Sequence, residues 1–168
     1  EIRNKYPQIF QICEESDGGF VHTADDRNAL DVTEEEREKF WEQQYARPGF
    51  SMWHGNFKDV YIDREANRLL SNFVARKIRS RVDDERIADL LIPKDHGFGT
   101  KRVPQETFYY EVYNQSNVRL VSLSETPFEC VTRKGIKTTD QEYEFDTIVY
   151  ATGFDAITDS FDRINIRG

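Results

Sequence analysis

Two adjacent cations, Lys101 and Arg102, follow the glycine-rich stretch Gly97-Phe98-Gly99. Lysine is a compact point charge suited to a phosphate, whereas arginine stays protonated in proteins and offers a planar fork of donors. Next to a flexible glycine segment, the pair could hold one anion and present a permanent cation to a second. The alternative is a solvated dibasic loop, because charge is ordinary on protein surfaces.

A second candidate is the small-residue turn that contains Thr152 and Gly153, followed by Asp155, at the end of the apolar run 146–150. Open α/β sheets bind ligands beyond the carboxyl ends of their strands, where glycine lets the backbone approach a cofactor closely. The alternative is a turn that serves packing alone. The sequence has neither a GxGxxG nor a Walker-type loop, so by itself it encodes no complete nucleotide site.

The composition excludes several classes of function. The chain has 168 residues, enough for roughly one domain, and a net charge of −8, which argues against nonspecific binding to nucleic acid or acidic membranes. No stretch approaches the roughly 20 apolar residues that span a bilayer. The start lacks an initiator Met and an apolar leader, so we expect a piece of a longer protein.

The cysteines indicate the compartment. Cys13 and Cys130 lie far apart, with no CxxC spacing and no clustered histidines. We therefore expect no metal site, two free thiols and a reducing, cytoplasmic setting.

Hydrophobic periodicity predicts an α+β chain with its helices first. A capping box at Thr33 and Glu36 starts one helix, and Asp63 starts the most periodic one. The predicted helices cover residues 3–15, 33–46, 63–82 and 84–91, with one or two helical turns at 108–113. The predicted strands cover residues 118–123, 128–132, 136–138 and 143–150, with a hairpin turn at 133–135.

Several of these segments, in order and spacing, resemble the flavin-dependent Baeyer–Villiger monooxygenases. Lys101-Arg102 stands before Tyr109-Tyr110, the run 114–120 (NQSNVRL) follows, and the run 151–156 (ATGFDA) comes last. The resemblance is strongest from about Leu91 to Gly168 and looser before that, where it extends to Gly49-Phe50 and residues 63–66. The resemblance implies a helical insertion subdomain (1–106), the returning β-rich half of a Rossmann-like NADPH-binding domain (107–152), and the start of the return into an FAD-binding domain (153–168).

The resemblance also implies a reaction and roles for residues. The full-length enzyme would use NADPH, FAD and O₂ to insert one oxygen atom next to the carbonyl of a small hydrophobic ketone. Lys101 would contact the 2′-phosphate of NADPH, and Arg102 would lie against the flavin and stabilise the anionic peroxyflavin. Thr152, Gly153 and Asp155 would neighbour the cofactors.

Two alternatives stay open at this point. One is a related flavin monooxygenase that oxidises nitrogen or sulfur centres, and the other is a non-catalytic helical interaction module. The glycine loops for both nucleotides lie outside these residues, so we expect the isolated chain to be inactive. It could self-associate through surface that the rest of the enzyme covers.

Overall fold

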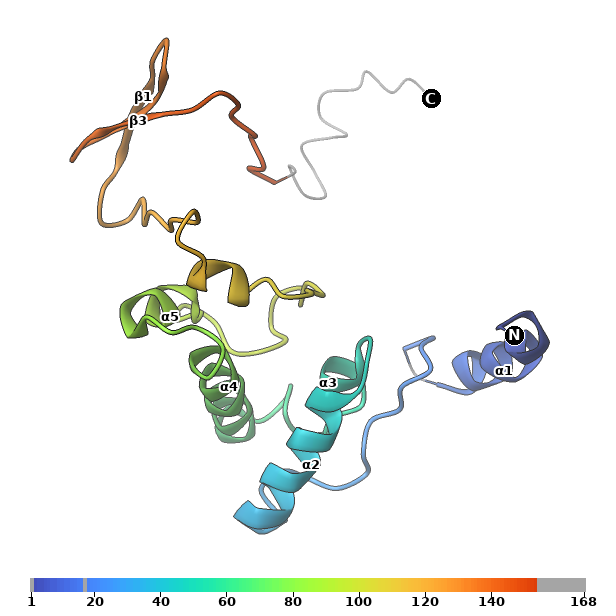
Figure 1. Ribbon diagram of the computed structural model, residues 1–168. Coiled ribbons are helices and arrows are strands. Elements are labelled where there is room, and N and C mark those ends of the chain that lie inside the picture. The colour runs from blue at the N-terminus through green and yellow to red at the C-terminus, as the bar shows by residue number, and fades with distance from the viewer. Residues whose placement is uncertain (1, 17, 154–168) are drawn as a thin grey trace, which may run out of the picture. The chain divides into compact units, whose positions relative to one another are not determined.

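The computed structural model describes residues 2–16 and 18–153 and divides the chain into two compact units, Glu1–Leu120 and Val121–Gly168 (Figure 1). The first unit is helical and the second holds a small sheet, which confirms the predicted α+β class. Asp155 and the predicted segment 153–168, apart from Gly153, lie outside the described residues.

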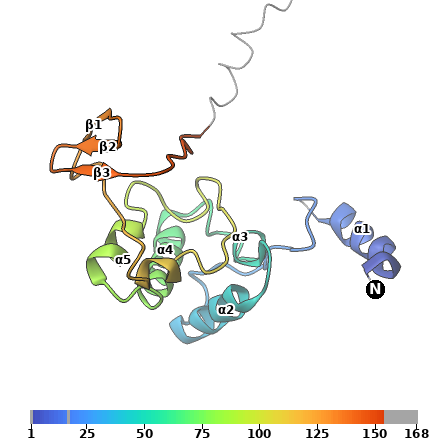
Figure 2. The same cartoon turned by 45° about the horizontal axis from the view of Figure 1, so that its top comes forward.

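The first unit contains the predicted helices and one more, α3, where the sequence predicts no helix. They are η1 (Ile2–Lys5), α1 (Tyr6–Glu15), α2 (Glu34–Ala46), α3 (Ser51–His54), α4 (Arg64–Arg79), α5 (Glu85–Leu91) and η2 (Glu111–Asn114). In both views α4 lies between α5 on one side and α2 with α3 on the other (Figures 1 and 2). Helix α4 ends three residues before the predicted end at Val82, since Ser80 closes it by donating its N–H to Arg76 and Ile78.

Side-chain caps fix where three of these helices begin. The Thr33 hydroxyl accepts a hydrogen bond from the Glu36 N–H at 3.3 Å, and the Glu36 carboxylate accepts one from the Thr33 N–H at 3.0 Å. This reciprocal pair is the predicted capping box. Two aspartates cap the other helices in one direction only. The Asp63 carboxylate accepts from the N–H groups of Glu65 and Ala66 at the start of α4, and the Asp84 carboxylate accepts from that of Ile87 in α5.

The core of the first unit forms around α4. The largest buried apolar side chains are Trp41 of α2, Phe57 and Val60 of the loop between α3 and α4, and Leu70 and Phe73 of α4. The rings of Trp41 and Phe73 lie 5.5 Å apart, so α2 and α4 meet through aromatic contact. Burial of each such side chain contributes about 2–3 kcal/mol. Helix α4 is therefore the scaffold on which later segments rest.

The second unit holds an antiparallel sheet of order β1-β2-β3, with β1 at Phe128–Val131, β2 at Gly135–Thr138 and β3 at Glu142–Glu144 (Figure 2). Val131 pairs with Ile136, which in turn pairs with Tyr143. The Thr132 hydroxyl accepts hydrogen bonds from the backbone N–H groups of the turn, which confirms the predicted hairpin.

Two of the predicted strands are wrong: one does not form, and the other is too long. Residues 118–123 form no strand, and the last strand ends at Glu144 instead of Tyr150. Val149 and Tyr150 are 80% and 68% exposed. An apolar run becomes a central strand only when strands on both sides satisfy its backbone groups, and the described residues supply no parallel partner. None of the described helices is long and apolar enough to cross a membrane.

Candidate functional site

The loop before the two cations is fastened to α4 by hydrogen bonds. The side-chain amide of Asn67 donates to the carbonyl oxygens of Val60, at 2.8 Å, and of Phe98, at 2.9 Å. The Ser71 hydroxyl accepts from the Phe98 N–H at 2.9 Å. The Phe98 ring packs against the core. Both backbone groups and the side chain of Phe98 are therefore fixed.

The glycines on either side of Phe98 make this approach sterically possible. A Cβ atom at Gly97 would overlap the amide of Asn67, and one at Gly99 would overlap the ring of Tyr61. Gly99 also has a φ of +78°, a conformation that favours glycine. The stretch predicted to be flexible is thus a tightly packed anchor.

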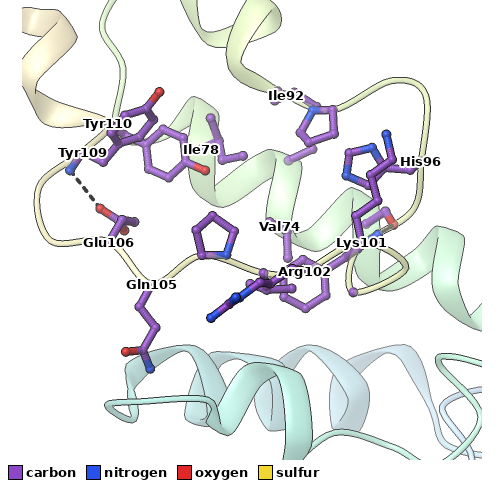
Figure 3. A pocket seen from close by; sticks show the side chains of 17 residues that line it. Val74, Ile78, Ile92, His96, Lys101, Arg102, Gln105, Glu106, Tyr109 and Tyr110 are labelled. Carbon is purple, nitrogen blue, oxygen red and sulfur yellow. Dashed lines mark hydrogen bonds between the residues drawn. The ribbon is translucent and has the colours of Figure 1, made fainter. Parts of the chain in front are cut away.

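Residues 99–106, which we name the strap, leave this anchor, and all of them except Thr100 line a pocket of about 460 Å³ (Figure 3). The wall of the pocket is largely apolar, with Val74 and Ile78 from α4 and Ile92 after α5. Tyr109 and Tyr110 add aromatic rings to it. Lys101 and Arg102 are the cations of its lining, so the structure brings this predicted pair to a pocket.

Lys101 already has a carboxylate partner. Its Nζ lies 2.7 Å from Asp95 Oδ2, and Asp95 Oδ1 lies 2.6 Å from His96 Nδ1. The hydrogen bond from Lys101 and then that from His96 hold the pKa of Asp95 well below its usual range. The Lys101 side chain is 60% exposed, so an incoming anion can reach it. Asp95 was not among the residues predicted from the sequence, although its position six residues before Lys101, in the same loop as Gly97 and Gly99, is a usable signal.

Arg102 differs from Lys101 because it forms no hydrogen bond or ion pair with the residues that the structure describes. Figure 3 shows its side chain extending away from Lys101 and His96. A guanidinium carries five N–H donors and no acceptor. An exposed guanidinium at an apolar wall is therefore available to an anionic or electron-rich group.

A second anchor holds the far end of the strap. The Arg81 guanidinium donates to Glu106 at 2.7 Å and to Glu111 at 2.6 and 2.7 Å, and it lies 4.9 Å from the ring centroid of Tyr110. The hydrogen bonds from Arg81 lower the pKa values of both carboxylates. This cluster was not predicted from the sequence, because Glu106 and Glu111 lie 25 and 30 residues after Arg81 and no local pattern joins them.

The structure does not assign the other predicted site residues, Thr152, Gly153 and Asp155, to this pocket. Thr152 and Gly153 belong to the second unit and are exposed, and Gly153 has a φ of +92°, which suits a glycine turn. Asp155 lies outside the described residues. Among the residues that are described, no group of three or more metal-ligating side chains gathers.

Comparison with known proteins identifies relatives along the whole chain. The 2-oxo-Delta(3)-4,5,5-trimethylcyclopentenylacetyl-CoA monooxygenase of Pseudomonas putida is 51% identical over 99% of the chain, which spans 31% of that relative. Cyclopentanone 1,2-monooxygenase of a Comamonas species is 38% identical over 99% of the chain and 30% of its own length. Phenazine N-monooxygenase PhzNO1 of Lysobacter antibioticus is 36% identical over 100% of the chain and 31% of its own length.

The fold agrees with these relatives. The crystal structure of OTEMO in complex with FAD and NADP superposes with a TM-score of 0.94 at 51% identity, over 99% of this chain and 31% of that one. No protein-family model matches the sequence. The chain spans about a third of the length of the relatives it matches. By sequence and by structure, it belongs to the family of Baeyer–Villiger-type flavin monooxygenases.

Proposed function

We propose that the full-length protein uses NADPH, FAD and O₂ to insert one oxygen atom next to a ketone carbonyl, giving an ester or lactone. The observation that carries this proposal is Arg102, an exposed guanidinium without a described partner at an apolar pocket. The relatives support it, since one is a cyclopentanone 1,2-monooxygenase and the OTEMO structure holds FAD and NADP.

The donor set of the pocket fits the two cofactors chemically. Two adjacent cations suit phosphate and other anionic groups, and the apolar and tyrosine-lined wall suits flat aromatic rings. In this proposal Lys101 binds the 2′-phosphate of NADPH, exchanging Asp95 for it. Arg102 stands beside the flavin, and Thr152, Gly153 and Asp155 are cofactor neighbours.

When bound, NADPH supplies the reducing equivalents and FAD activates O₂. Arg102 contributes a positive charge where negative charge develops during the reaction. A guanidinium keeps its proton in proteins, so it stabilises such a charge without neutralising it by proton transfer.

The remaining parts of the proposal concern the parent protein. Residues 1–106 form a helical insertion, residues 107–152 form the returning half of a Rossmann-like NADPH-binding domain, and residues 153–168 lead into an FAD-binding domain. We also propose a cytoplasmic location, which the free thiols of Cys13 and Cys130 support.

Arg102→Ala in the full-length protein tests the central claim. We expect flavin reduction by NADPH to stay within about 2-fold of the parent rate and ester formation to fall at least about 100-fold. Arg68→Ala is the matched control, because within the described residues Arg68 pairs with Glu65 on the exposed face of α4. Retention of ester formation in Arg102→Ala would refute the role of Arg102.

The second candidate function is oxidation of a nitrogen or sulfur centre. The phenazine N-monooxygenase relative favours it, although at lower identity than the relatives named above for ring ketones. A product assay with a cyclic ketone beside a thioether separates the two. Oxidation of the thioether without oxidation of any ketone would favour this second candidate. A non-catalytic interaction module has no support among the named relatives.

Self-association of the isolated 168-residue chain remains part of the proposal. Several apolar side chains of the second unit are exposed, among them Phe128, Val131, Val149 and Tyr150. Exposed apolar surface of this kind favours association. Sedimentation of the isolated chain at high concentration is the test, and a clean monomer would contradict it.

A further inference from the structure

Arg81 is the most heavily bonded cation in the described part of the chain. Besides its contacts with Glu106, Glu111 and Tyr110, its Nη1 donates to the hydroxyl of Tyr45 at 3.1 Å. Its carbonyl oxygen accepts from the side chain of Asn114 at 2.9 Å. Its side chain is only 20% exposed, and the hydrogen bonds to Glu111 and then to Glu106 raise its pKa. Three segments therefore converge on one residue at the end of α4.

The position of Arg102 relative to these contacts is informative. Phe98, fixed by Asn67, lies four residues before Arg102, and Glu106, fixed by Arg81, lies four residues after it. Between these points residues 102–105 form no hydrogen bond with the rest of the described chain. The strap is therefore held at its two ends, by Asn67 through Phe98 and by Arg81 through Glu106. Asn67 belongs to α4, and Arg81 belongs to the turn that follows it.

We propose that Arg81 is a positioning residue that fixes the far end of the strap through Glu106 and Glu111, and so sets where Arg102 stands in the pocket. This inference rests on the proposed function for its catalytic consequence. The structural part of the inference, that Arg81 holds the strap through Glu106 and Glu111, does not depend on the proposed function.

Arginine is needed at this position for geometric reasons. The planar fork serves two carboxylates at once, each through two N–H groups, while its face lies over Tyr110. The ammonium group of lysine is a single point with three donors and cannot reproduce the two paired contacts. Arg81→Lys therefore keeps the positive charge and removes the paired contacts of Arg81 with Glu106 and Glu111, which we name the Arg81 clamp.

The test uses Arg81→Lys in the full-length protein, with Arg79→Lys as the matched control. Arg79 belongs to the same helix end and pairs with Asp89 at 3.2 Å on the exposed surface, away from the strap. We expect Arg81→Lys to lower the ester formed per NADPH consumed about 10-fold, through kcat and not through the ketone KM. Flavin reduction by NADPH stays within about 2-fold, and Arg79→Lys resembles the parent.

The ratio of ester to NADPH separates positioning from simple loss of folded protein, because partial unfolding lowers both quantities together. The rate of backbone amide hydrogen exchange in residues 99–110 can be measured without turnover. We expect Arg81→Lys to raise this rate and Arg79→Lys to leave it unchanged. Unchanged exchange in Arg81→Lys overturns the inference, and so does raised exchange with an unchanged ester ratio.

The two proposals fail separately. If the parent forms no ester from any ketone, the proposed function falls, and the exchange data alone then support or overturn the clamp. If Arg81→Lys yields too little folded protein, Glu111→Gln replaces it, since that variant keeps Arg81 and Glu106. Glu111→Gln is expected to raise exchange of residues 99–110 as well, and unchanged exchange in it overturns the inference.

Discussion

The side-chain amide of Asn67 donates a hydrogen bond of 2.9 Å to the carbonyl oxygen of Phe98, which lies 31 residues further along the chain. The same amide donates to Val60, so one side chain joins the start of α4 to both the preceding loop and the strap anchor. Because Lys101 and Arg102 lie three and four residues after Phe98, their placement depends on Asn67, a residue of α4 that does not line the pocket.

Gly97→Ala is expected to destabilise the chain by about 2 kcal/mol, because the added methyl group must displace the amide of Asn67 and its hydrogen bonds. Urea unfolding followed by the fluorescence of Trp41 and Trp53 measures the loss. Gly18→Ala is the control, since its Cβ would meet Phe20 at 3.4 Å, an ordinary contact. Equal effects of the two substitutions would contradict the packing argument.

Lys101→Ala tests the cofactor role of this cation. If Lys101 meets a 2′-phosphate, the variant should raise the KM for NADPH about 10-fold and leave that for NADH nearly unchanged. Lys94→Ala is the control, because Lys94 is similarly exposed and pairs with Asp89 outside the pocket. Steady-state kinetics with both coenzymes give the answer, and equal shifts for NADPH and NADH would argue against the assignment.

The Arg81 clamp should contribute to acid sensitivity. Hydrogen bonds from Arg81 hold the pKa values of Glu106 and Glu111 below their ordinary value of 4.5 in the folded chain. The unfolded chain therefore takes up these protons first, so the stabilisation is complete above about pH 5 and is lost as the pH falls through and below 4.5. In Arg81→Gln the free energy of unfolding should fall less steeply between about pH 5 and 3. An unchanged slope in urea unfolding would count against the clamp.

His22 should make the free energy of unfolding depend on pH in a higher range than Glu106 and Glu111 do. Burial, followed by the nearby charges of His54 and Arg47, lowers its pKa from the ordinary value of 6.5. The folded chain favours the neutral imidazole, so its stabilising effect is complete above pH 6.5 and declines as the pH falls further. His22→Gln should flatten this decline between about pH 6.5 and 5. Titration of the imidazole by NMR would detect the shift directly, and a midpoint at 6.5 would contradict it.

The helices could be predicted from the sequence because their determinants are local. Thr33 and Glu36 lie within one helical turn, and Asp63 stands next to the apolar face that it starts. The hairpin around residues 133–135 is local in the same sense. The run 143–150 was predicted too long, because pairing of its second half depends on strands that the sequence pattern does not reveal.

The site could be predicted only in part, and for a similar reason. Lys101 and Arg102 are neighbours in sequence, so their shared position at the pocket needed no long-range information. The contacts of Arg81 with Glu106 and Glu111 join residues that no periodicity relates. The glycines beside Phe98 were visible in the sequence, but their purpose depends on Asn67 and Tyr61, which approach only in the folded chain.

The dependence of the strap on α4 has a consequence for protein engineering. A chimaera that imports residues 95–114 into a homologous enzyme without the matching helix would carry the two cations but lose the amide and the guanidinium that hold them. The smallest segment that can be transplanted therefore begins before Val60, because Asn67 also donates to the carbonyl oxygen of Val60. It continues through Asn114, which donates to the carbonyl oxygen of Arg81.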